Sequence, residues 1–192
     1  MSLKKHLLFM ARYNIWASQE IRRFVKTHEK KYPKILDTPV SGLPFSTVRN
    51  VLAHIWAADQ VWYSRMKNLS EVQTKDGSIR LSTKELYTYW VDNHENEGKY
   101  GDIFKNEDSD KIFTALQESG QAWIDIIETQ FKTDEEIIQK EFSYFSTGGV
   151  SHKSFFYEVF GSVVPFFFFN KKLKIKRKCT NNNNNKIEVK YQ

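Results

Sequence analysis

The sequence predicts an all-α protein, a bundle of four main helices with a truncated last helix and a disordered basic tail. Two observations lead to this prediction. Apolar residues recur at spacings of three and four over long stretches, which is the period of an amphipathic helix. Serine or threonine stands at the start of several stretches, where helix caps are found. We expect residues 1–164 to form the bundle and residues 165–192 the tail.

Residues 2–28 are expected to form the first helix, with Ser2 as its cap. Its apolar face includes Asn14, whose amide we expect to be hydrogen-bonded to a neighbouring helix. Residues 29–45 contain three prolines and a glycine, which exclude regular structure over much of their length. They are expected to be a connection that runs along the bundle or covers one end of it.

Residues 46–68 are the clearest helix, because neither glycine nor proline interrupts their apolar pattern. His54 shares one side of this helix with Val51, Ala58 and Val61 and is therefore expected to face the core. Two interpretations remain open for it. Its imidazole is either a neutral group hydrogen-bonded inside the bundle or a metal ligand, since neutral imidazole is the commonest metal donor in proteins.

Residues 69–82 are expected to be a polar loop. Ser82 and Glu85 have the spacing of a capping box, so a third helical segment is predicted from there, and it fades over residues 93–101. His94 lies in this polar stretch and is expected to be a solvated surface residue.

Residues 109–131 form the next predicted helix, with Ser109 as its cap. Gly120 within it is expected to mark close packing between helices, because glycine otherwise weakens a helix. A short helical turn is predicted over residues 133–140, where Thr133 and Glu136 form another capping box.

Residues 141–163 combine an extended arm with the start of the last helix. Alternation at Phe142 and Tyr144 predicts the arm, and Gly148 and Gly149 predict a turn after it. The last helix is expected to be capped near Ser151, with His152 at its start and its apolar pattern ending at Val163.

The positive charge of the chain belongs to its tail. Residues 165–192 hold eight basic residues and one acid, a net charge of +7, so residues 1–164 sum to −1 of the total of +6. The tail combines runs of phenylalanine, lysine and asparagine without periodicity, which is typical of disorder. Because the body is nearly neutral, the sequence offers no strong evidence for nucleic-acid binding.

The single cysteine, Cys179, excludes an internal disulfide framework and a cysteine zinc site. No apolar run reaches the roughly 18 residues that a membrane-spanning helix needs. We therefore expect a cytoplasmic protein without a transmembrane segment.

Four motifs together resemble the DinB-like family of metal-dependent enzymes, which includes thiol S-transferases. They lie in the predicted first helix, the second helix, the extended arm and the approach to the last helix, and they cover roughly residues 1–163. The motifs are YNIWAS from Tyr13, LAHIWAADQVWYSR from Leu52, the arm residues Phe142, Tyr144 and Gly148, and FFYEVFGSV from Phe155.

The resemblance implies a bundle of four main helices around one divalent metal, zinc or nickel, held by three histidines. One of these histidines comes from the second helix and corresponds to His54. The other two come from the last helix, where histidines four residues apart share one face and can bind a metal together with a third. A small-molecule substrate and a homodimer are the partners that the resemblance implies.

The sequence departs from this pattern because no histidine follows His152. His54 is the one metal ligand that can be carried over, and two of the three expected ligands are missing. The expected function is therefore a DinB-like hydrolase or transferase fold that is inactive or metal-deficient as given. The alternative is a non-catalytic helical protein whose basic tail, residues 171–178, binds polyanions or acidic membrane.

Two explanations of the tail also remain open. Residues after Val163 are either a translated intron or frameshifted end, or a genuine basic tail. The first explanation accounts for both the missing histidines and the abrupt change of composition, because codons for Phe, Asn, Lys and Ile can consist of A and T alone.

Overall fold

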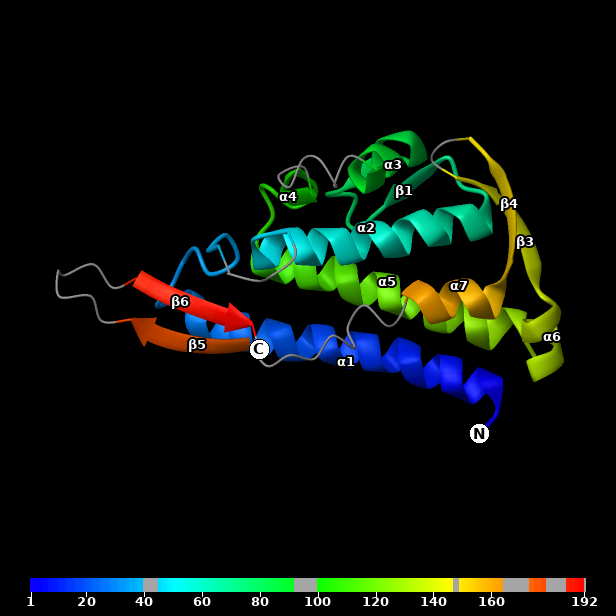
Figure 1. Ribbon diagram of the computed structural model, residues 1–192, viewed down its shortest axis with the longest axis horizontal. Helices are drawn as coiled ribbons and strands as arrows, with labels where there is room; N and C mark the ends of the chain where they lie inside the picture. The colour runs from blue at the N-terminus through cyan, green and yellow to red at the C-terminus, as the bar shows by residue number, and fades with distance from the viewer. Residues whose placement is uncertain (40–44, 92–99, 147–148, 164–172, 179–185, 192) are drawn as a thin grey trace.

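The computed structural model describes residues 1–39, 45–91, 100–146, 149–163, 173–178 and 186–191. These residues are mostly helical, as predicted, and three two-stranded ribbons accompany the helices. No helix among them is long and apolar enough to cross a membrane. The helices are α1 (Leu3–Glu29), α2 (Val48–Lys67), α3 (Thr83–Val91), α4 (Tyr100–Ile103), α5 (Ser109–Gln130), α6 (Asp134–Gln139) and α7 (Phe156–Val163) (Figure 1).

Local capping determines where most of these helices begin, as the sequence predicts. Ser2 and Thr47 each accept a hydrogen bond from the backbone N–H three residues later. The predicted capping boxes at Ser82 with Glu85 and at Thr133 with Glu136 are both present. A cap of this kind contributes about 1 kcal/mol, because it satisfies backbone donors that the first helical turn leaves unpaired.

The start of α5 differs from the prediction. Asp108, not Ser109, is the cap, because its Oδ1 accepts the N–H of Lys111 at 2.9 Å. The Ser109 hydroxyl donates instead to Glu29 at the end of α1, at 2.8 Å. A serine predicted to cap its own helix therefore links two helices.

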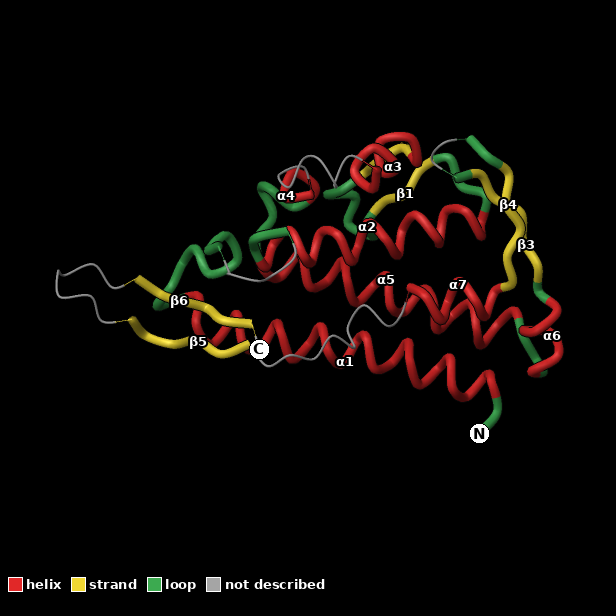
Figure 2. Tube along the Cα trace, viewed as in Figure 1, coloured by secondary structure: helices red, strands yellow, loops and turns green. Residues whose placement is uncertain are grey.

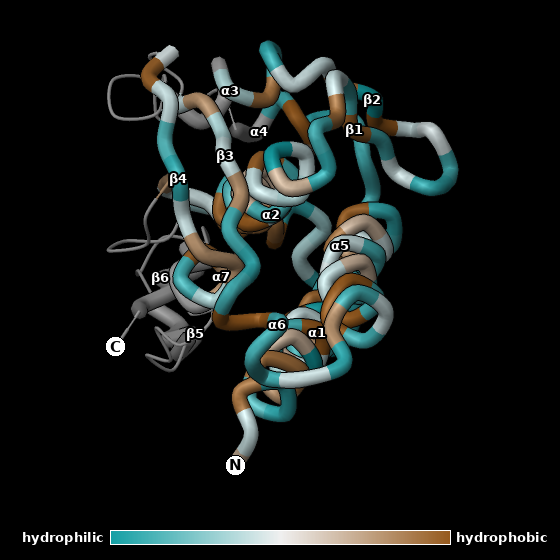
Figure 3. Tube along the Cα trace, turned by 90° about the vertical axis from the view of Figure 1, so that its right-hand side faces the viewer, coloured by the Kyte–Doolittle hydropathy of each residue, from teal (hydrophilic) through white to brown (hydrophobic). Residues whose placement is uncertain are grey.

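The long helices lie side by side. Helix α5 packs against both α1 and α2, and the short α7 contacts α1 and α2. The view along the helices shows α2, α5, α1 and α7 around a common axis (Figure 3). Gly120 permits the close approach of α5 to α1, since a Cβ there would lie only 2.6 Å from Cγ1 of Ile15. The prediction that Gly120 marks close packing is confirmed.

Asn14 does not follow its prediction. Its side-chain oxygen is buried and has no hydrogen-bond partner among the residues that the structure describes. The expected link from this oxygen to a neighbouring helix is therefore wrong for the described part of the chain.

The core consists of two apolar clusters. One joins α2 to the first half of α5 and is centred on Trp56, Phe104 and Ile112. The other joins the start of α1, the second half of α5, α6 and α7, and it contains Phe156 and Phe160. Although α7 has only eight residues, it supplies two of the largest fully buried side chains.

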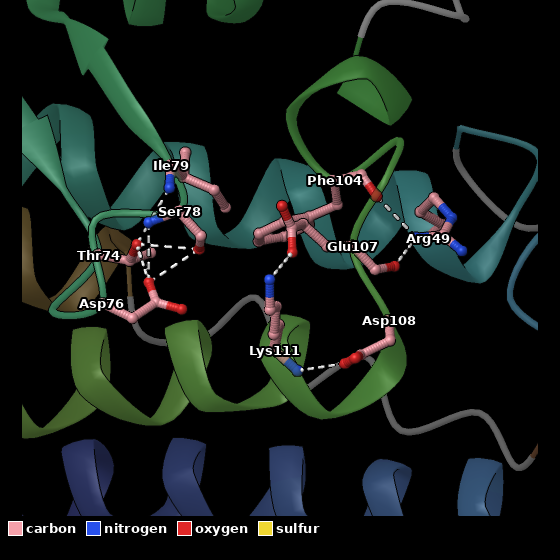
Figure 4. Close-up of polar contacts among 9 residues, drawn as sticks. All are labelled: Arg49, Thr74, Asp76, Ser78, Ile79, Phe104, Glu107, Asp108 and Lys111. Atoms are coloured by element: carbon pink, nitrogen blue, oxygen red, sulfur yellow. Dashed lines mark hydrogen bonds and ion pairs between the residues drawn. The ribbon is translucent and has the colours of Figure 1, made fainter.

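The stretch predicted as a polar loop over residues 69–82 contains a hairpin. Strands β1 (Glu71–Gln73) and β2 (Arg80–Ser82) pair antiparallel. At the turn, Asp76 Oδ1 accepts the Thr74 hydroxyl at 2.7 Å and the Ser78 N–H at 3.0 Å (Figure 4). The loop prediction missed the strands because each has only three residues, and burial of Val72 and Ile79 stabilises them against the core.

The last helix begins later than predicted. Residues expected near its start form β4 (Ser151–Phe155), which pairs antiparallel with β3 (Glu141–Phe145) (Figure 2). His152 consequently lies on a strand opposite Tyr144. The extended arm is confirmed. Its strand partner β4 was predicted as helix, but backbone pairing across the turn outweighs the local cap at Ser151.

Two strands also lie within the tail. Strands β5 (Leu173–Lys178) and β6 (Lys186–Tyr191) pair antiparallel, with Ile175 opposite Val189. The prediction expected no regular structure in residues 165–192. It missed the alternation of apolar and charged residues in LKIKRK and KIEVKY, which has the period of a strand.

Candidate functional site

His54 lies in the second turn of α2 and is buried, with 9% of its surface exposed. The ring of Phe45 stacks on its imidazole, with ring centroids 4.5 Å apart. Burial lowers the pKa of His54 from 6.5 to about 4, because the charged form loses its hydration. The imidazole is therefore neutral at pH 7, as both interpretations of His54 require.

The segment before α2 holds Phe45 in an uncommon conformation. Its φ angle is +63°, and that of Ser46 is +64°, in a region that bulky side chains rarely adopt. The Phe45 carbonyl accepts the Thr47 N–H at 2.7 Å and the Asn50 side-chain N–H at 3.0 Å. These bonds hold the strained backbone in place, so the aromatic ring stays over His54.

Replacing Phe45 by alanine is expected to raise the pKa of His54 from about 4 towards 6.5, because the imidazole then gains water on the face that the ring covers. Proton NMR titration of the histidine ring signals would measure this change, with His54→Gln assigning the signal. Phe45→Leu is the matched control, since it keeps an apolar cover. An unchanged pKa in Phe45→Ala would show that the ring of Phe45 does not control the hydration of His54.

Two of the other histidines that the structure describes make contacts of their own. His28 contacts the carbonyl of Phe24 through its own Nδ1, and the exposed His152 stacks on Tyr144. His94 lies outside the described residues. Among the residues that the structure describes, no group of three His, Cys, Asp or Glu side chains could hold a metal ion. The described part therefore does not fit the three-histidine centre that the resemblance implies.

A second buried polar group, whose Asp59 belongs to the motif LAHIWAADQVWYSR, joins α2 to α5. The Ser119 hydroxyl donates to Asp59 Oδ2 at 3.1 Å and accepts the Gln60 side-chain N–H at 3.1 Å. Burial raises the pKa of Asp59 from 3.8 to about 7, although Ser119 and the nearby Trp123 indole act in the opposite direction. The carboxyl can thus gain or lose a proton near neutral pH.

One signal in the sequence could have identified Asp59 as buried. It is a charged residue on the apolar side of a predicted helix. Asp59 and Gln60 lie between Ala58 and Val61, after a run from Val51 to Ala58 that is apolar apart from His54. Asp59 is 8% exposed and has no charged partner in the described part of the chain. Its geometry suits proton storage inside the protein better than attack on a substrate, which would need an open path to the carboxyl.

The cleft beside the start of α2 is occupied by mutually paired charges. Lys26 and Asp110 face each other across it at 2.6 Å, and Arg49 binds Asp37. Arg49 also donates to the carbonyls of Phe104 and Glu107, at 2.7 and 2.8 Å (Figure 4). These contacts anchor the connection after α1, and they leave the charges of the cleft satisfied.

Comparison with protein-family models, curated proteins and solved structures found no match. Fold and site together define a mostly helical protein with a buried, neutral histidine on its second long helix.

Proposed function

We propose that this chain has the bundle of the DinB-like metal-dependent hydrolases and transferases, and that His54 is the metal donor it retains from them. The motif residues around His54 carry this proposal, and the neutral state of His54 permits metal binding, because an imidazole must be unprotonated to bind a metal ion. Its position on α2, within the motif LAHIWAADQVWYSR, agrees with the resemblance. The short α7 packs against both α1 and α2, which is compatible with a last helix that closes a bundle.

In this proposal the chain as given binds divalent metal weakly and has lost the metal-dependent reaction. One imidazole does not hold a catalytic metal, which takes about three protein ligands and an open position. No histidine follows His152 in the sequence, so the last helix cannot supply the usual pair.

Zinc titration of the full chain and of chimeric proteins would test the proposal. In the chimeras, a helical segment with two histidines four residues apart replaces residues 164–192, in four successive helical frames. We expect one frame to bind Zn²⁺ at least 100-fold more tightly than the full chain. His54→Ala should abolish this gain, and His152→Ala, on the exposed strand β4, should leave it intact.

Two results would contradict the proposal in separable ways. If no frame gains zinc binding that depends on His54, the likeness to the DinB-like bundle is wrong. If the unmodified chain binds zinc tightly through His54, the bundle stands but its metal centre is complete with other donors.

A second function rests on the tail. We propose that residues 171–178, which carry most of its positive charge, bind polyanions or acidic membrane. Retention on heparin and sedimentation with vesicles containing phosphatidylserine should both fall steeply as salt rises from 50 to 200 mM. Binding releases counterions from the polyanion, and added salt makes this release less favourable. Deletion of residues 171–178 should abolish both, and unchanged binding after the deletion would exclude this function.

A further inference from the structure

Arg65, in the last turn of α2, is surrounded by aromatic rings from three elements. Its guanidinium carbon lies 4.7 Å from the ring centre of Trp62, 5.1 Å from that of Tyr87 and 4.8 Å from that of Tyr144. These rings belong to α2, α3 and β3. We call Arg65 and the three rings the aromatic box.

Arg65 differs from the other arginines whose side chains the structure describes. Each of the others pairs with a carboxylate, as the distances for Arg12, Arg22, Arg49 and Arg80 show, and Arg23 pairs with Glu20. Arg65 has no carboxylate partner among the described residues, although its side chain is half-buried. The aromatic box therefore contains a positive charge without a matching negative one.

The nitrogens of Arg65 indicate where its unused binding capacity lies. Nε is buried and has no hydrogen-bond partner in the described part of the chain. The two terminal nitrogens make no hydrogen bond in the described part of the chain, and they are not among its buried atoms without a partner, so the outer edge of the guanidinium reaches solvent. Aromatic rings stabilise a cation through their faces, but they do not satisfy its N–H donors.

We propose that the aromatic box binds the oxyanion of a small molecule, a carboxylate or a phosphate, through the outer edge of Arg65. The planar fork of an arginine matches both groups with two parallel hydrogen bonds. The low-dielectric aromatic surroundings strengthen this attraction relative to an exposed arginine. The proposal does not depend on a metal or on the proposed bundle family.

The aromatic box also connects three elements, so the alternative is that Arg65 only holds β3 and α3 against α2. In that case its terminal nitrogens would stay hydrated, and added anions would not bind in a saturable way. Both roles predict that removal of Arg65 lowers stability, so a stability measurement does not separate them. Anion titration does, because only the binding role predicts saturable binding.

The test is a titration of the ¹⁵N-labelled full chain with sodium phosphate and, separately, sodium acetate, at an ionic strength held constant with sodium chloride. The Nε–H signal of Arg65, assigned by its loss in Arg65→Lys, and the Trp62 indole N–H signal are followed. We expect at least one anion to shift both signals along a saturable curve. The anion that saturates at the lower concentration identifies the oxyanion class.

Two variants make the result specific. Arg65→Lys keeps the charge but loses the fork, and we expect it to weaken binding at least tenfold when read from the Trp62 signal. Arg12→Lys, at an exposed ion pair with Glu128, should bind as the parent does. Circular dichroism confirms that each variant is folded. Linear shifts without saturation for both anions, or equal affinity in Arg65→Lys, would overturn the proposal.

Discussion

Phe156→Ala is expected to lower the free energy of unfolding by about 3–5 kcal/mol, the usual range for a fully buried phenylalanine. Phe156 has no exposed surface, and its ring contacts those of Phe131, Trp123 and Phe160 at centroid distances of 4.8, 6.5 and 5.8 Å. Its removal would leave a cavity where α7 meets α5 and α6. Urea denaturation of the full chain, followed by tryptophan fluorescence, measures the loss.

Phe155→Ala is the matched control for this experiment. Phe155 precedes Phe156 in the chain and has the same side chain, but it is 37% exposed at the end of β4. We expect its replacement to cost less than about 1.5 kcal/mol, because less apolar surface returns to water. Equal losses in the two variants would mean that α7 is not packed into the core as described.

Asp59→Asn is expected to stabilise the protein by roughly 2–4 kcal/mol at pH 8 and by much less near pH 4. The folded state keeps this carboxyl neutral up to about pH 7, whereas the unfolded chain ionises it near 3.8. Its contribution is therefore fully present below pH 3.8 and is lost as pH rises through 7. Asparagine keeps an oxygen for the Ser119 hydroxyl and cannot ionise. Urea denaturation at pH 4, 6 and 8 measures the difference.

His54 changes stability in the opposite direction. Its pKa falls from 6.5 in the unfolded chain to about 4 in the folded protein, so its contribution is present above pH 6.5 and is lost as pH falls towards 4. The two groups therefore offset each other between pH 4 and 6.5. As pH falls from 6.5 to 4, the free energy of unfolding of Asp59→Asn should decrease more steeply than that of the parent, and the free energy of unfolding of His54→Gln should increase.

A parallel pH dependence of Asp59→Asn and the parent would contradict this account. It would mean that Asp59 is ionised and hydrated in the folded protein, and that its hydrogen bond with Ser119 lies at the surface. The pH series distinguishes this outcome from a general destabilisation, because a general destabilisation lowers the free energy of unfolding equally at all three pH values.

The sequence by itself determined the helices, because their signals are local. The period of apolar residues predicts α1, α2 and α5, and capping residues such as Ser2 and Thr133 act within one turn of the residues they satisfy. The inward position of His54 follows from the same periodicity. Gly120 was also predictable, since a glycine inside a strong helix indicates a close neighbour.

Only the tertiary structure decided which distant residues meet. Ser151 is a residue type that often caps helices, but pairing with Phe145 of β3 makes it part of a strand. Strand pairing depends on a partner elsewhere in the chain, which local helix signals do not report. The elevated pKa of Asp59 requires the desolvation that α5 imposes, and the aromatic box requires α2, α3 and β3 together. Burial and charge partners are properties of the packed chain, so periodicity, which reports one element at a time, cannot reveal them.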